Sequence, residues 1–382
     1  MTHPRHPTIP APQDEAENVA GPEPRRCGAD SEVVRKESIE DLVSFLTEDG
    51  TAAAPSLAEA PRHTLCTWQA VDELAAAVAM EIGNEDLRRR NASVLAKLRA
   101  TNGRVRQLRR LPDQWRSDID ALERSFPNFC DVLQYVRTMG ALAELHDGVV
   151  KLDPMLFDGT PGTGKSTFAE QLAKIVAGGF QRVLMSSAET GAQLGGSAAS
   201  WANSQAGQVF ELLVNGKEAN PVILLDELDK AMLHPGERFS PVGPLYQLLE
   251  PAMARTFRDI SVPTLEIDAS AIVWMATSND RHLLPAPILS RLLSFDIPLP
   301  GPAVAVQVVH SVLRQMADAE PVFARFQLSA EAATKLAMHG PRAVRSLLRR
   351  ACGSAAQSAC WTVHAHDVPD NRAERAPMGF CA

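Results

Sequence analysis

The spacing of apolar residues changes near residue 150 of the chain. Beyond that point, short continuous apolar runs are separated by helical patterns and loops, and such runs are typical of parallel strands covered on both faces. The pattern predicts an α/β fold with a doubly wound, five-stranded parallel sheet. The strand candidates are residues 155–157, 182–186, 222–225, 271–276 and 295–299.

Helical patterns flank the predicted sheet on both sides. Residues 302–360 have helical spacing, with Pro302 placed to open one helix and Ser329 placed to cap another. Residues 67–126 are also predicted to be helical, and their apolar residues recur with the seven-residue period of a coiled-coil seam. The segment Thr101–Gly103 interrupts this period, so a bent helix or a helical hairpin is equally compatible with it.

Composition separates these regions from the ends of the chain. The residues before about position 30 are polar and rich in proline, which predicts a segment without a folded core. A second Ala/Pro-rich patch near residues 50–61 is typical of a linker. The predicted organisation is a tail 1–60, a helical N-terminal region 61–125, an α/β domain 126–301, a helical domain 302–360 and a tail 361–382.

Charge is distributed unevenly along the chain. The 382 residues carry a formal net charge of −8, which argues against a general attraction to nucleic acid. The stretch 87–116 is nevertheless strongly basic. It is either a surface for nucleic acid or an acidic partner, or a solvated helical face that contacts an acidic neighbour in an assembly. Its cations, set against the single acid Asp113, are Arg88, Arg89, Arg90, Lys97, Arg99, Arg104, Arg106, Arg109, Arg110 and Arg116.

Two sequence features bear on location. The chain has no apolar run of the roughly 18 residues that a membrane span needs, and no apolar leader at its N-terminus. Its six cysteines are scattered rather than arranged as a disulfide framework, which suits a reducing compartment. We therefore expect a cytoplasmic protein with no membrane partner.

The most specific motif is a glycine-rich loop between a predicted strand and a predicted helix. It fits the pattern G-x-x-x-x-G-K-[ST], whose backbone N–H groups surround the phosphates of a nucleotide at a helix N-terminus. Lys165 would reach the β- and γ-phosphates, and the Ser166 hydroxyl would bind Mg²⁺. The loop residues are Gly159, Thr160, Pro161, Gly162, Thr163, Gly164, Lys165, Ser166 and Thr167.

Two adjacent acids end the strand candidate 222–225. At that edge of the sheet, Asp226 is placed to hold Mg²⁺ through water, and Glu227 is placed to polarise a water molecule beside the γ-phosphate. A pair of acids after a strand is a weak signal alone. Following a phosphate loop, it predicts a site that hydrolyses ATP with Mg²⁺.

Together with the phosphate loop, four segments of the chain resemble the corresponding segments of AAA+ ATPases, and within that group those of the ATPase module of Lon-type proteases. The resemblance covers roughly residues 125–355, with the segments in the order that the family has. It implies a P-loop sheet of the AAA+ type, with the helical domain 302–360 as its lid. The segments are Asn220–Lys230, Ala276–Asn279, Leu284–Arg291 and Gly340–Arg345.

The resemblance implies roles for further residues. Asn279 would help to orient the hydrolytic water, and Arg291 would act as an arginine finger on the nucleotide of a neighbouring subunit. Arg342 of the lid would contact the nucleotide of its own chain, although Arg345 or Arg349 could take that role.

The resemblance also raises three questions about activity. Trp201 matches the aromatic residue that Lon-like modules carry into a central pore to grip polypeptide, but it could instead pack under its own Gly/Ser-rich loop. Asp158 stands where the family has an apolar residue, and it either points away from the phosphates or weakens nucleotide binding. Too few residues follow position 360 for a Lon peptidase domain, so we expect no peptide-bond cleavage by this chain.

Together these expectations describe an ATPase that assembles as a homo-oligomeric ring, such as a hexamer, and remodels or unfolds proteins. Its cofactors would be ATP and Mg²⁺, and its substrates unfolded or misfolded polypeptides. Two alternatives remain open. One is a nucleic-acid-directed AAA+ motor or loader that uses the basic stretch, and the other is a nucleotide-dependent scaffold that does not hydrolyse ATP.

Overall fold

The computed structural model describes residues 60–186, 190–198, 204–233 and 242–369 of the chain. The predicted tail 1–60, apart from Ala60, lies outside these residues, as do the residues from 370 onward. Trp201 also lies outside the described residues, so its predicted place in a pore loop stays a prediction.

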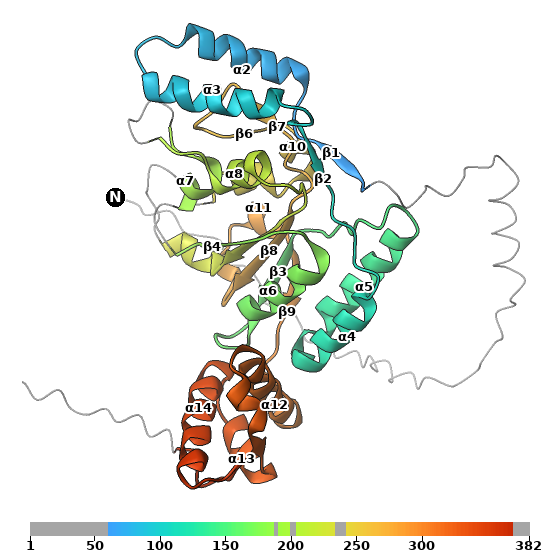
Figure 1. Cartoon of the computed structure of the whole chain (residues 1–382), viewed down its shortest axis with the longest axis vertical. Coiled ribbons are helices and arrows are strands. Elements are labelled where there is room, and N and C mark those ends of the chain that lie inside the picture. Colours follow the sequence, from blue (N-terminus) through green and yellow to red (C-terminus); the bar gives the residue numbers. More distant parts are fainter. Residues whose placement is uncertain (1–59, 187–189, 199–203, 234–241, 370–382) are drawn as a thin grey trace, which may run out of the picture. The chain divides into compact units, whose positions relative to one another are not determined.

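A five-stranded parallel sheet with the order β4-β5-β8-β3-β9 forms the centre of the fold (Figure 1). This confirms the predicted α/β sheet. Three strands start two residues away from the predicted position, because pairing with the neighbouring strand, rather than hydropathy alone, sets where a strand begins. The strands are β3 (Met155–Asp158), β4 (Phe180–Leu184), β5 (Val222–Asp226), β8 (Val273–Ser278) and β9 (Leu293–Asp296).

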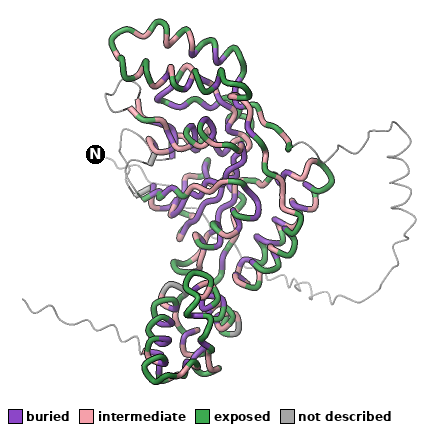
Figure 2. Tube along the Cα trace, viewed as in Figure 1, coloured by how far each residue is buried: buried purple, intermediate pink, exposed green. Residues whose placement is uncertain are grey.

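Alternate residues of the central strands enter two separate cores. On β5, Val222 and Leu224 pack in one core, whereas Ile223 and Leu225 pack in the other. The strands are therefore buried on both faces, as Figure 2 shows for the centre of the sheet. One face is covered by α4 (Trp115–Ser125), α5 (Cys130–Glu144) and α6 (Lys165–Val176). The other is covered by α7 (Thr190–Gly195) and α8 (Gln208–Asn215), and α2 (Trp68–Met80) and α3 (Glu85–Arg99) extend the same core, with α3 packed against α8.

The N-terminal region contains a helical hairpin rather than one long seam. Helices α2 and α3 pack side by side (Figure 1), and the chain then pairs β2 (Val105–Gln107) antiparallel with β1 (Arg62–Thr64). The coiled-coil interpretation was therefore wrong. The bent-helix and hairpin alternatives were wrong as well, because both placed the interruption at Thr101–Gly103, whereas the observed hairpin turns between the end of α2 and the start of α3. After α3, the left-handed φ of 59° at Asn102 turns the chain into strand β2, so the prediction of helix throughout residues 67–126 was wrong there.

Short elements connect β5 to β8 and β8 to β9. They include an antiparallel pair of two-residue strands and several single-turn helices, which complete the core on the α2–α3 side of the sheet. The elements are α9 (Leu245–Leu248), α10 (Pro251–Ala254), β6 (Phe257–Arg258), β7 (Glu266–Ile267) and α11 (Ala286–Leu289).

The C-terminal helices have a core of their own. Pro302 opens α12, and the Ser329 hydroxyl accepts a hydrogen bond of 3.2 Å from the Ala332 backbone N–H, so both predicted helix starts are confirmed. Val363 and Val368 are buried in this core, which therefore continues past residue 360. The elements are α12 (Pro302–Ala319), β10 (Gln327–Leu328), α13 (Ala330–Ala337), α14 (Pro341–Gln357) and β11 (Thr362–Val363), with β10 and β11 paired in parallel.

Candidate nucleotide-binding site

The glycine-rich loop connects β3 to α6, as predicted. Gly159 has a φ of +154°, and a Cβ at this position would lie 2.4 Å from the Ile297 carbonyl oxygen. Gly164 caps α6 with a left-handed φ of +93°, which residues with a side chain rarely adopt. The loop therefore depends on glycine, and it delivers the chain into the N-terminus of α6, where free N–H groups attract anions.

Lys165 is buried at the start of α6 and faces the loop. Its Nζ donates to the backbone oxygens of Gly159 (2.5 Å) and Thr160 (3.0 Å) and to Asn279 Oδ1 (3.2 Å). Burial lowers the pKa of Lys165, and the nearby carboxylate of Asp158 opposes that shift. Lys165 and Asn279, which are far apart in sequence, thus meet because β3 and β8 are neighbours in the sheet.

Asp226 is buried at the end of β5, and both of its carboxylate oxygens accept hydrogen bonds. Oδ1 accepts from Ser166 Oγ (2.6 Å) and Thr277 Oγ1 (2.7 Å), and Oδ2 accepts from Arg182 Nε (2.9 Å) and Nη2. Burial alone would raise the pKa of Asp226, but these hydrogen bonds outweigh it and hold the pKa below its usual range.

Ser166 and Asp226 fit the ligand set that Mg²⁺ prefers. A hydroxyl oxygen and a carboxylate lie beside each other at the mouth of the phosphate loop, so Ser166 and Asp226, the latter through water, would hold Mg²⁺ there, and the ion would supply charge that neutralises phosphate oxygens. The two residues that the sequence singles out for the metal are therefore adjacent.

Glu227 has an unusual backbone conformation. Its φ is +58°, a region that costs a residue other than glycine about 1–3 kcal/mol and that is found at functional sites. The Glu227 backbone N–H donates to Thr277 Oγ1 (2.9 Å), and its carboxylate lies 2.6 Å from Lys230 Nζ. Thr277 thus holds the backbone of one acid and the side chain of the other.

These side chains open into one cavity of about 1170 Å³. The loop from Pro161 to Thr167 lines it, together with residues of the C-terminal helices such as Ser311 and Gln315. Its polar lining includes Lys165, Ser166, Arg182, Asp226, Glu227, Thr277 and Asn279.

The predicted arginines lie in different places. Arg291 is not among the residues that line the cavity; its Nη1 donates to the Pro287 carbonyl oxygen and its Nε lies 3.8 Å from Glu250 Oε2. Arg342 is at the start of α14, and its side chain lies outside the described part of the chain. Of the alternatives to Arg342, Arg345 lines the cavity.

Arg349 and Asp158 contact other groups. Arg349 pairs with Glu320 and lies over the Phe323 ring, 5.4 Å from its centroid. Asp158 is half-buried, with Arg281 Nε 4.0 Å from its carboxylate. Asp158 is not among the residues that line the cavity, although its carboxylate is close enough to Lys165 to oppose the lowering of the Lys165 pKa.

Arg182 and Thr277 were missed by sequence reasoning. Thr277 belongs to the segment Ala276–Asn279, in which only Asn279 was given a role. Its available signal was a hydroxyl residue at the end of a buried strand. Arg182 was counted only as part of a strand candidate. A cation at the start of an apolar run was its signal, but the sequence does not say which acid it meets.

Many of the cations in the basic stretch 87–116 form hydrogen bonds or ion pairs with other residues of the chain. Arg106 is buried and donates to the carbonyl oxygens of Leu213 (2.8 Å) and Val214 (2.6 Å). Arg104 donates to the Cys66 carbonyl oxygen and lies over the Trp68 ring, 3.9 Å from its centroid. These contacts favour a structural role for the stretch over a nucleic-acid surface.

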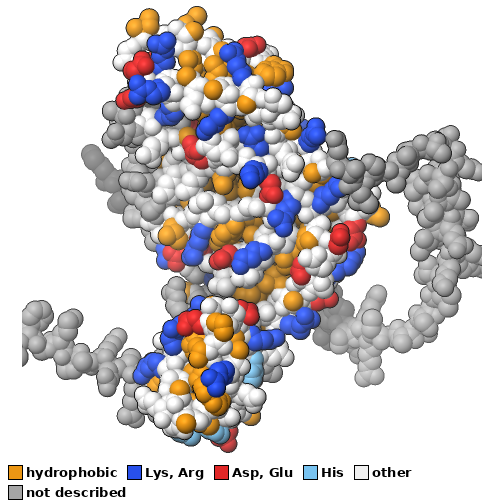
Figure 3. All heavy atoms as spheres, viewed as in Figure 1, with side chains coloured by type: hydrophobic (Ala, Val, Ile, Leu, Met, Phe, Trp, Pro, Cys, Tyr) orange, Lys and Arg blue, Asp and Glu red, His pale blue; other side chains and the backbone are white. Residues whose placement is uncertain are grey.

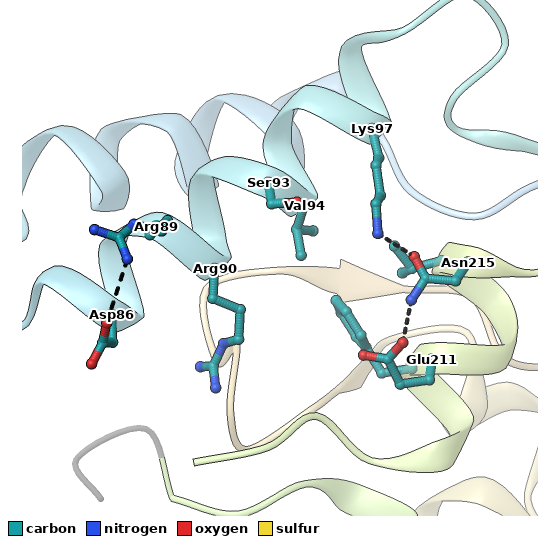
Figure 4. Close-up of a pocket in the computed structure, with 10 residues that line it drawn as sticks. Asp86, Arg89, Arg90, Ser93, Val94, Lys97, Glu211 and Asn215 are labelled. Atoms are coloured by element: carbon teal, nitrogen blue, oxygen red, sulfur yellow. Dashed lines mark hydrogen bonds and ion pairs between the residues drawn. The ribbon is translucent and has the colours of Figure 1, made fainter. Parts of the chain in front are cut away.

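The surface supports the same interpretation. On the face shown in Figure 3, Lys and Arg side chains are interspersed with Asp and Glu rather than gathered in one patch. In the groove between α3 and α8, drawn in Figure 4, Arg89 pairs with Asp86, and Lys97 bonds to Asn215, which in turn bonds to Glu211. Carboxylates therefore lie beside some of the cations of α3, and a neutral amide accepts a hydrogen bond from Lys97.

Comparison with known proteins agrees with this geometry. Residues 155–299 match the family described as ATPase family associated with various cellular activities (AAA). These residues are an AAA domain. It begins at the first residue of β3 and ends shortly after β9, so it contains the whole sheet and the phosphate loop. Nucleotide binding, typically with Mg²⁺, is what membership of this family implies.

The AAA domain resembles that of Lon proteases. A peroxisomal Lon protease homolog 2 of Caenorhabditis briggsae is 33% identical over 173 residues, which are 45% of this chain and 22% of that protein. Lon protease 4 of Sorangium cellulosum is 29% identical over 209 residues, 53% of this chain and 26% of that protein. The chain thus spans about a quarter of the length of these relatives.

A solved structure is similar at a lower level. The RuvB Holliday junction branch migration motor of Thermotoga maritima has 16% sequence identity and a TM-score of 0.43, over 62% of this chain and 66% of that one. This similarity is too low to support a closer assignment. Among the residues that the structure describes, no helix has both the length and the apolar character needed to cross a membrane.

Proposed function

We propose that this chain is an ATPase that hydrolyses ATP to ADP and phosphate, works in a homo-oligomeric ring such as a hexamer, and remodels or unfolds protein substrates. The observation that carries the proposal is the network around Thr277, in which one hydroxyl bonds both to the buried carboxylate of Asp226 and to the backbone of Glu227. Such a network holds two acids at fixed positions beside a phosphate loop.

Each residue of the network has a defined task in hydrolysis. Lys165 and the N–H groups at the start of α6 would bind the phosphates, with Lys165 exchanging its backbone acceptors for phosphate oxygens. Mg²⁺, held by Ser166 and Asp226, supplies neutralising charge to the phosphate oxygens when bound. Glu227 would polarise the attacking water, and Asn279 would orient it.

Assembly is supported by the position of Arg291. Since Arg291 does not line the cavity of its own chain, an arginine finger at this position would serve a neighbouring subunit. The Arg291 Nε makes no hydrogen bond, although it lies 3.8 Å from Glu250 Oε2 of the same chain. Hydrolysis would then depend on ring formation.

The remaining parts of the proposal concern partners and location. Unfolded or misfolded polypeptides are the proposed substrates, and the loop that includes Trp201 is the proposed gripping element. A nucleic-acid partner has less support because the basic stretch is occupied by contacts within the chain. A cytoplasmic location is proposed from the cysteines: Cys66, Cys130, Cys352 and Cys360 are free thiols.

The test is the steady-state rate of ATP hydrolysis measured against protein concentration, with Glu227→Gln as the control. We expect turnover per subunit to rise with concentration and with added unfolded protein, and Glu227→Gln to bind ATP but lose at least a hundredfold in rate, a typical loss for a group that acts on the attacking nucleophile. Stimulation by DNA alone would favour a nucleic-acid motor. Binding without turnover would favour a scaffold.

A further inference from the structure

Arg182 is a cation that shares the proposed metal-binding carboxylate. It lies on β4, the edge strand beside β5, and both its Nε (2.9 Å) and its Nη2 donate to Asp226 Oδ2. The partners differ sharply in exposure, since the side chain of Asp226 is 2% exposed and that of Arg182 is 49% exposed.

The two carboxylate oxygens of Asp226 accept from different kinds of donor. Oδ1 is taken by the hydroxyls of Ser166 and Thr277, which are neutral groups. The opposite oxygen, Oδ2, is where Arg182 brings a positive charge. A buried carboxylate without a neighbouring cation strongly destabilises the folded protein. Asp226 should therefore lose Arg182 only when another cation takes its place.

We propose that Arg182 competes with Mg²⁺ for Asp226, so that Arg182 is a positioning residue that sets how much metal the nucleotide site requires. This inference rests on the proposed function, because it concerns the same nucleotide site. Two cations near one carboxylate repel each other, so metal binding would release Arg182.

The structure favours Arg182 as the partner that moves. Its side chain is long, half-exposed and part of the cavity lining, so the released guanidinium can enter water at little cost. Thr277 by contrast is buried and also holds the Glu227 backbone, so it stays in place. The exchange would keep Asp226 paired with a cation both before and after the metal binds.

The experiment measures Mn²⁺ binding to the full chain in the presence of ADP, by the electron paramagnetic resonance signal of free Mn²⁺. We expect Arg182→Gln to bind Mn²⁺ roughly threefold to fivefold more tightly than the wild type, the change expected for loss of a partly exposed charge pair. The control Lys174→Gln removes a different cation from the lining of the same cavity, one that does not contact Asp226. Because Lys174 does not pair with Asp226, this control should change the affinity for Mn²⁺ by less than twofold.

A second readout is the temperature of thermal unfolding, measured first without metal or nucleotide and then with both. Thermal unfolding without added metal should occur at a lower temperature for Arg182→Gln than for the wild type, because Asp226 then has no cation. Mn²⁺ with ADP should raise the unfolding temperature of the variant more than that of the wild type. If Arg182→Gln does not fold, Arg182→Lys, which keeps the charge with fewer donors, is compared with the wild type directly and should bind Mn²⁺ more tightly by a smaller factor.

The outcomes separate this inference from the proposed function. If the wild type binds Mn²⁺ with ADP and Arg182→Gln binds it equally or more weakly, Arg182 does not compete and the inference is overturned. A similar gain for Lys174→Gln would overturn it too, since general electrostatics would then explain the effect. If the wild type binds neither Mn²⁺ nor ADP, the proposed function itself fails.

Discussion

At the scale of single residues, the site depends on groups with more than one partner. Thr277 is buried, accepts from the Glu227 N–H and donates to Asp226. The Glu227 N–H belongs to a residue in a left-handed conformation, which persists only when its surroundings hold it. One hydroxyl therefore links backbone strain at the proposed catalytic acid to the proposed metal ligand.

Replacing this hydroxyl should affect both stability and turnover. Thr277→Val keeps the shape of the side chain but leaves the Glu227 N–H without its acceptor, so we expect a loss of about 1–3 kcal/mol in the free energy of unfolding, measured with urea. The ATPase rate should fall with it. Thr277→Ser retains the hydroxyl and should restore most of both quantities; equal damage from the two variants would contradict the role given to the hydroxyl.

At the scale of elements, α3 contacts the C-terminal end of the Gly/Ser-rich segment 194–207, which contains the proposed pore loop. Arg90 Nη1 donates to the Ser204 carbonyl oxygen (2.7 Å), and its Nη2 donates to that of Ser261 (2.6 Å). Asp259, which is fully buried, accepts from the backbone N–H groups of Gly207 and Ser261 (2.8 Å each). The helical hairpin is thus joined to the α/β domain through this segment.

Removing the Arg90 contacts should loosen that segment locally. We expect Arg90→Ala to speed amide hydrogen exchange in peptides that cover residues 204–210, as measured by mass spectrometry, because the carbonyl oxygens lose their charged donors. Arg89→Ala is the matched control: Arg89 is the adjacent residue, but it is exposed and pairs with Asp86 instead (Figure 4). Equal exchange in both variants would show that the segment does not depend on Arg90.

At the scale of the whole molecule, the proposal is that each active site would combine the Glu227 of one subunit with the Arg291 of its neighbour. A ring that mixes Arg291→Ala with Glu227→Gln subunits should therefore regain part of the ATPase activity that each variant lacks alone. In such a ring, an intact finger from the Glu227→Gln subunit meets an intact cavity of the Arg291→Ala subunit. Mixtures are measured at constant total protein, and a rate that never exceeds the sum of the separate variants would place Arg291 outside the active site of its neighbour.

Much of the fold was predictable because its signals are local. The phosphate loop combines glycine conformations with a helix start, and a buried strand needs a run of apolar residues whatever its neighbours are. The strand β5 and the two acids at its end, Asp226 and Glu227, were therefore found from the sequence, as were the helix starts at Pro302 and Ser329. The coiled-coil prediction failed because the seven-residue period was counted across Thr101–Gly103, where the helix ends and the chain continues as strand β2.

Contacts between distant residues needed the tertiary structure. Ser166, Arg182 and Thr277 meet at Asp226 only because β4, β5 and β8 lie side by side in one register and α6 begins over their ends. In the sequence, by contrast, Arg182 was an ordinary strand cation, and the arginines of the basic stretch were candidates for nucleic acid. A residue type limits which bonds a side chain can form, whereas the packing of strands and helices decides which partner comes within reach of it.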